Sequence, residues 1–185
     1  MLALLRASRS GDRAAFDRLF ESLYGELKRL ARRQLRRGRP GQTLSTTAVV
    51  HETYLKLTQG SPVDVHDRGH FMALAARAMR QVIVDVARRR QAHKRGSGEA
   101  AALLDESEIA VDAVAEELLA VEESLKKLEA VDERLARIVE WRFFGGMSEE
   151  EIAQTLGVTS RTVRRDWRQA RAFLFRDIAG QGEER

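Results

Sequence analysis

The apolar positions of this chain recur at spacings of three and four almost throughout, and strand-like alternation is nearly absent. The pattern predicts long helices over about 12–37, 45–58 and 68–93, followed by amphipathic helices over 114–128 and 131–143. In the third of these, apolar residues cover two faces, which is typical of a helix buried between neighbours. We therefore expect an all-α fold.

The segment after Gly146 predicts two short helices joined by a tight turn. Ser148 and Glu151 form an S-x-x-E capping box, which satisfies free backbone donors at a helix start. Gly157 can adopt the positive φ at which a helix ends, and Thr159 or Ser160 can cap the next helix. The spacing is typical of a helix-turn-helix, whose second helix enters a DNA major groove.

The second of these helices has one apolar side, formed by Val163, Trp167, Ala170 and Leu174. Its outward side then carries the polar residues Arg161, Thr162, Arg164, Arg165 and Arg168. DNA binding is the favoured interpretation of this arginine-rich side. The alternative is an ordinary corner of a helical bundle, because arginine is a good helix former and is often simply solvated.

Charge is unevenly distributed along the 185 residues, although the net charge is only +4. Residues 1–96 carry a net charge of +12, residues 97–130 carry −8, and the remainder is balanced. The basic first part suits a polyanionic partner, and the acidic middle does not. The Gly, Ser, Ala and acidic residues of 96–112 predict a flexible linker between two small helical domains, 1–95 and 113–181.

Several classes of site are poorly supported by the sequence. The chain has no cysteine, which excludes disulfides and thiolate metal sites. His51 and Glu52 begin like the H-E-x-x-H zinc motif, but position 55 is Leu. We found no Gly-rich phosphate loop, no nucleophile with a nearby base, no signal peptide and no apolar run of membrane length. We therefore expect a cytoplasmic, non-enzymatic protein without metal or cofactor.

Over about residues 3–179, the chain resembles the extracytoplasmic-function (ECF) group of bacterial RNA polymerase sigma factors. The stretch TAVVHETYLKL at 47–57 is similar to that family's polymerase-clamp-binding helix. The stretch HFMALAARAMRQVIVDVARRR at 70–90 is similar to its promoter-melting helix. The most specific match is RFFGGMSEEEIAQTLGVTSRTVRRDWRQARAFL at 142–174.

This resemblance implies a sigma factor that binds core RNA polymerase and directs promoter-specific initiation. The first domain would bind the clamp and recognise and melt the −10 element, and the second would recognise the −35 element. Family members are often held inactive by an anti-sigma factor, and their linker lies in the polymerase channels. The implied polymerase-binding residues are His51, Glu52, Tyr54 and Lys56. The implied −10 residues are Arg77, Arg80, Gln81 and Arg88. The implied −35 residues are Ser160, Arg161, Thr162, Arg164, Arg165 and Arg168.

Asp166 departs from the family pattern, in which a basic residue is common at this position. It either accepts from a cytosine amino group or holds an arginine in place, and we favour the second role. Two other functions stay open from the sequence. A stand-alone regulator that binds operator DNA as a dimer would explain the helix-turn-helix but not the basic first part. An RNA-binding bundle would suit the basic stretch at 28–39.

Overall fold

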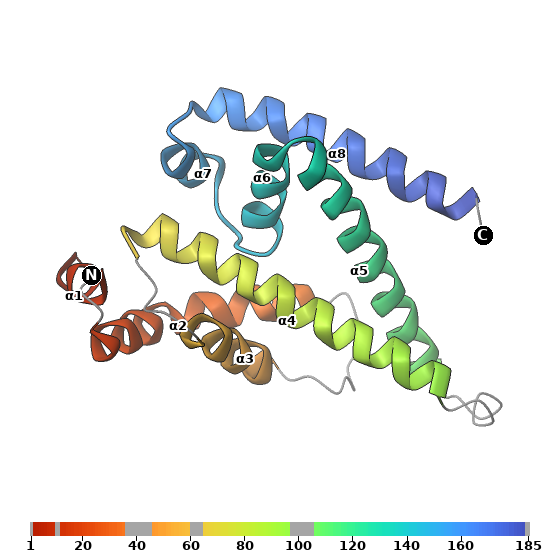
Figure 1. The fold of residues 1–185 in the computed structure, drawn as a ribbon, viewed down its shortest axis with the longest axis horizontal. Helices are drawn as coiled ribbons and strands as arrows, with labels where there is room; N and C mark the ends of the chain where they lie inside the picture. Colours follow the sequence, from red (N-terminus) through yellow and green to blue (C-terminus); the bar gives the residue numbers. More distant parts are fainter. Residues whose placement is uncertain (1, 10–11, 36–45, 60–64, 97–105, 184–185) are drawn as a thin grey trace.

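The structure is a computed structural model that describes residues 2–9, 12–35, 46–59, 65–96 and 106–183. These described residues form helices joined by short connections and contain no strand, which confirms the all-α prediction (Figure 1). In chain order the helices are α1 (Leu2–Arg9), α2 (Arg13–Leu35), α3 (Thr46–Thr58), α4 (Arg68–Gly96), α5 (Glu106–Val131), α6 (Glu133–Phe143), α7 (Glu149–Leu156) and α8 (Ser160–Glu183).

Helix α4 is the element on which the others are arranged. It packs against α3 on one side and against α5, α6 and α7 on the other (Figure 1). Side chains of α2 also reach it, since the rings of Phe16 and Phe20 lie 6.0 and 6.2 Å from the ring of Phe71. Both apolar faces of α4 are buried, as the sequence pattern predicts.

The buried apolar side chains form one continuous cluster that extends from α1 to α8. Phe71 of α4, Leu19 of α2, Leu125 of α5 and Val163 of α8 are all 1% exposed or less. The two parts of the chain also meet through polar groups, because the buried Gln34 amide of α2 donates to the carbonyl of Phe143 in α6. In this arrangement the C-terminal helices pack on α4, and a division into two domains stays a prediction.

Some helix boundaries differ from the predicted ones. Helix α5 begins at Glu106, so residues 106–112 of the predicted linker are helical, and residues 97–105 lie outside the described residues. Composition allows this, because residues 106–112 contain two Glu and one Ala, which are good helix formers, and neither Gly nor Pro. Helix α8 continues past Leu174 to Glu183, and the short α1 was not predicted.

The turns of the helix-turn-helix have the predicted geometry. Ser148 Oγ accepts from the Glu151 backbone N–H at 3.1 Å, and Glu151 Oε2 accepts from the Ser148 N–H at 2.9 Å. Gly157 ends α7 with a φ of 67°. Of the two candidate caps for α8, Thr159 is the one used, since its Oγ1 accepts from the Thr162 N–H at 3.2 Å. These short-range interactions set where α7 begins and ends and where α8 begins.

Two glycines with positive φ allow a matched test of how the loop between α6 and α7 packs. Gly146 has a φ of 60° and Gly157 a φ of 67°, so alanine at either position costs about 1–2 kcal/mol of backbone strain. A methyl group at Gly146 would also overlap the side chain of Leu30 in α2, whereas one at Gly157 meets nothing within 4 Å. We expect Gly146→Ala to lower the free energy of unfolding in urea more than Gly157→Ala does. Equal losses would contradict the close packing on Leu30.

Candidate nucleic-acid interface

The predicted recognition helix α8 is oriented by its apolar side. Val163 and Ala170 are fully buried and Trp167 is half-buried. This orientation leaves four arginines exposed along the first half of the helix: Arg161, Arg164, Arg165 and Arg168. The other two predicted residues, Ser160 and Thr162, are half-buried, and the Thr162 hydroxyl lies 3.0 Å from that of Thr159. The exposed surface of the helix is therefore formed mainly by guanidinium groups.

Glu149 connects three helices beneath this surface. Its Oε1 accepts from Nη1 of Arg142 in α6 at 2.8 Å, and its Oε2 accepts from Nε of Arg164 in α8 at 3.0 Å. The guanidinium of Arg142 also lies 4.6 Å from the ring of Trp167, in cation–π contact. The hydrogen bond from Arg142 and the interaction with Arg164 lower the pKa of Glu149. Arg164 is thus held against α7.

Asp166 is buried and holds arginines from two helices. It is 1% exposed, and its Oδ2 lies 3.0 Å from Nη2 of Arg134 in α6. Its Oδ1 lies 3.1 Å from Nη2 of Arg165, whose own side chain is 66% exposed. Burial at this level keeps Asp166 from the edge of a base, which supports the favoured role of holding an arginine. By contrast, Arg161 and Arg168 have no carboxylate within ion-pair distance in the described part of the chain.

A second basic surface lies on α4. Arg77, Gln81 and Arg88 are exposed, and Arg88 lies 4.0 Å from Asp85 on the same helix. These residues line a cavity of about 180 Å³ whose opposite wall is formed by α5 and α6. That wall is acidic, since it contains Glu122, Glu129 and Glu140 beside Lys126.

Arg80, the fourth implied −10 residue, does not share this exposed surface. Only 9% of Arg80 is exposed, and its guanidinium donates to Glu122 Oε2 and Glu140 Oε2, each at 2.8 Å. The two partners are 42 and 60 residues away in the sequence, so helical spacing alone could not predict these ion pairs. Contact of Arg80 with DNA stays a prediction.

The four residues predicted to bind polymerase divide into two pairs on α3. His51 and Glu52 are exposed. Tyr54 instead packs its ring edge-on against Phe20 and donates its hydroxyl to Asp17 of α2 at 2.8 Å. Lys56 forms an ion pair with Asp85 of α4 at 3.0 Å. Helix α3 therefore presents His51 and Glu52, while Tyr54 and Lys56 connect it to its neighbours.

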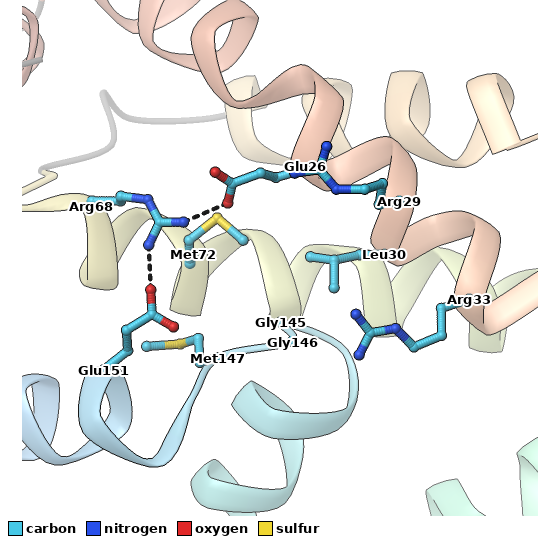
Figure 2. A pocket seen from close by; sticks show the side chains of 10 residues that line it. All are labelled: Glu26, Arg29, Leu30, Arg33, Arg68, Met72, Gly145, Gly146, Met147 and Glu151. Atoms are coloured by element: carbon cyan, nitrogen blue, oxygen red, sulfur yellow. Dashed lines mark hydrogen bonds and ion pairs between the residues drawn. The ribbon is translucent and has the colours of Figure 1, made fainter.

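A cavity of about 150 Å³ lies where α2, the start of α4, the α6–α7 loop and α7 meet (Figure 2). Arg68 of α4 extends between Glu26 of α2 and Glu151 of α7 and forms ion pairs with both (Figure 2). Burial raises the pKa of Glu151, but the hydrogen bonds from Ser148 and Arg68 outweigh it, so that the pKa lies below the ordinary value. Arg68 and its partners join the two parts of the chain, a role that the sequence did not indicate.

The described residues contain no group of three or more His, Cys, Asp or Glu side chains placed to hold a metal ion. Within the same residues, no helix is long and apolar enough to cross a membrane.

A family model described as ECF sigma factor matches residues 1–180. The match covers nearly the whole chain, so the chain belongs to the ECF sigma factor family. Members of this family act in transcription initiation and are not enzymes, which agrees with the resemblance seen in the sequence. Family membership also implies binding to RNA polymerase and to promoter DNA. No curated protein and no solved structure matches the chain.

The lowered pKa of Glu149 predicts a dependence of stability on acid. A carboxyl group with a lowered pKa stabilises the folded state above its ordinary pKa of 4.5, and this contribution is lost as the pH falls through the lowered value. We expect Glu149→Gln to be less stable than the wild type at neutral pH, and the difference to shrink below pH 4.5. Thermal unfolding of both proteins, from neutral pH to below pH 4.5, measures this difference in stability. Glu150→Gln is the matched control, because Glu150 is exposed; a similar pH dependence there would contradict the role of Glu149.

Proposed function

We propose that this sigma factor recognises a −35 promoter element with α8 and a −10 element with α4, and binds the polymerase clamp through α3. Family membership supports the general role in initiation. The observation that carries the finer assignment is the row of exposed arginines on α8, which the buried Val163 and Ala170 turn outward. No nucleotide hydrolysis is needed, since the free energy comes from contacts with DNA and polymerase.

The arginines of α8 differ in how they can act on DNA. Arg165 is exposed while Asp166 restrains its guanidinium, and a restrained fork suits bidentate contact with a guanine edge. Arg161 lies in the first turn of α8, which is the part of a recognition helix that contacts base edges. Arg168 lies farther along the helix, and we assign it to phosphate. Arg164 is paired with Glu149 and contributes mainly to the position of the helix.

Helix α4 supplies groups suited to a separated DNA strand. Arg77 and Arg88 provide exposed positive charge for the backbone, and the exposed amide of Gln81 can bind the edge of an adenine. On α3, His51 and Glu52 are the exposed residues that we assign to the clamp. A stand-alone regulator would leave this basic first part of the chain without a role.

Reconstitution with core RNA polymerase tests the proposal directly. We expect the purified chain to make core polymerase start transcription at a defined set of promoters, and the sequenced transcripts to share −10 and −35 motifs. The chain alone should bind promoter duplex weakly, because polymerase and the second element supply the remaining affinity. Tight duplex binding without polymerase, together with no effect on transcription, would favour a stand-alone regulator.

Substitution of single arginines tests the assignment on α8. Arg165→Ala should relax sequence choice at one −35 position and cost about 1–3 kcal/mol there, because a bidentate contact with one base is lost. Arg168→Ala should instead weaken binding to every −35 sequence by about the same factor, because a phosphate contact does not depend on the base. Transcription from a −35 library with reconstituted polymerase measures both. A uniform loss for Arg165→Ala would show that Arg165 contacts only phosphate.

A further inference from the structure

Arg134 of α6 is an exposed arginine whose position is not explained by the stability of its own helix. It lies in the first turn of α6, where the helix dipole disfavours a positive charge. Its side chain is 46% exposed and reaches across to α8, where its Nη2 lies 3.0 Å from Asp166 Oδ2. Arg134 is therefore placed by a contact with the recognition helix, against which α6 packs (Figure 1).

Asp166 brings the guanidinium groups of Arg134 and Arg165 next to each other. Its Oδ1 accepts from Nε of Arg165 at 3.2 Å and lies 3.1 Å from Nη2 of the same residue, while its Oδ2 contacts Arg134. Asp166 itself is 1% exposed, whereas the side chains of the two arginines are 46% and 66% exposed. A ligand that approaches this surface therefore meets two positive charges, of which one carboxylate neutralises only half.

The two arginines are held in different ways. Arg165 approaches Asp166 with two nitrogen atoms, one of them in a hydrogen bond. Asp166 Oδ2 has no hydrogen-bond partner among the described residues, so its contact with Arg134 is an ion pair without hydrogen-bond alignment. Asp166 thus fixes the orientation of the Arg165 guanidinium, and it leaves the N–H donors of Arg134 able to turn toward a second acceptor.

A phosphate of the DNA backbone is the acceptor that suits Arg134. A guanidinium binds phosphate oxygens with its fork of N–H donors, and phosphate and sugar receive at least half of protein–DNA hydrogen bonds. Base edges are contacted mainly by the recognition helix, and Arg134 comes from α6, outside that helix. Because its guanidinium lies beside that of Arg165, it meets the edge of the groove when Arg165 contacts a base inside the groove.

We propose that Arg134 is a further promoter contact, which binds a backbone phosphate of the −35 element beside the base bound by Arg165. Asp166 is the positioning residue of this pair, because one buried carboxylate sets the spacing between the two guanidiniums. The proposal rests on the function proposed above. It extends the −35 contacts from α8 to α6, and it gives the buried Asp166 a role in sequence choice.

The salt dependence of promoter binding tests Arg134. Core polymerase reconstituted with the full chain is titrated, between about 50 and 200 mM salt, with a fluorescein-labelled duplex of a promoter found by transcript sequencing. Each phosphate contact adds about −0.9 to the slope of log affinity against log salt, so the advantage of the wild type over Arg134→Ala should fall about 3.5-fold across this range. Arg134→Lys keeps one positive charge and should retain the wild-type slope.

Arg137→Ala is the matched control for Arg134→Ala. Arg137 belongs to the same helix and its side chain is 50% exposed, but its ion pair is with Glu133 of α6 and not with α8. Its removal should leave the slope unchanged. A wild-type slope for Arg134→Ala would show that Arg134 only neutralises Asp166, and an equal change for both variants would show that only net charge matters. Either result would overturn the proposal.

Asp166→Asn tests the positioning role, because asparagine keeps the size of the side chain and removes its charge. Transcription from the −35 library should lose about fivefold in preference at the position bound by Arg165, the lower end of the range for one bidentate contact. Adding Arg165→Ala should relax this preference no further than Arg165→Ala alone. A loss of stability would lower transcription equally from all −35 sequences, and such a uniform loss would overturn the positioning role.

Two further measurements keep these tests decisive. Circular dichroism checks the fold of each variant, and if Asp166→Asn does not fold, Asp166→Glu keeps the buried charge, changes the spacing and should relax the same position. If the wild type starts transcription at no defined promoter, the proposed function fails. The same salt series with the full chain alone, on a duplex of mixed sequence, then decides whether Arg134 binds phosphate, and an unchanged slope for Arg134→Ala would overturn that contact as well.

Discussion

The fold depends on the burial of two faces of α4. One face packs on α2 and α3 and the other on the C-terminal helices, so this helix lies at the centre of the continuous core. Only a narrow strip of α4 stays in contact with water, and that strip holds Arg77, Gln81 and Arg88. Arg80 lies on the edge of the buried side, where an unpaired charge would be costly. Its burial therefore requires Glu122 and Glu140, and the acidic character of α5 follows in part from this requirement.

The helix-turn-helix shows the opposite use of carboxylates, because there they position arginines without covering them. Glu149 holds Arg164, and Asp166 lies between Arg134 and Arg165, while the arginines themselves stay exposed. A side chain that is already restrained loses less conformational entropy when it binds. The carboxylates also lower the net positive charge of the surface, which weakens non-specific attraction to DNA. Such a surface gains selectivity and gives up affinity, which suits a protein that binds DNA together with polymerase.

Interactions within a few residues were predictable, and those across the fold were not. The capping box of Ser148 and Glu151 and the positive φ of Gly157 were visible because their partners lie three or four residues away. The two buried faces of α4 followed from periodicity. The roles of Arg68 and Arg80 were not visible, since their partners are up to 83 residues distant. The position of Tyr54 was not predictable either, because its hydroxyl donates a hydrogen bond to Asp17 on another helix.

The packed arrangement leaves the two predicted DNA contacts unequally available. Arg161, Arg165 and Arg168 of α8 are exposed, whereas Arg80 of α4 is covered. Contacts with duplex DNA through α8 need no rearrangement of α5 and α6, but contacts through Arg80 do. If α4 binds the −10 element as we propose, the guanidinium of Arg80 would have to exchange Glu122 and Glu140 for phosphate, whereas the arginines of α8 have no such exchange to make. His51 and Glu52, which we assign to the clamp in our proposal, are exposed on α3, and α3 packs on the other side of α4 from α5 and α6.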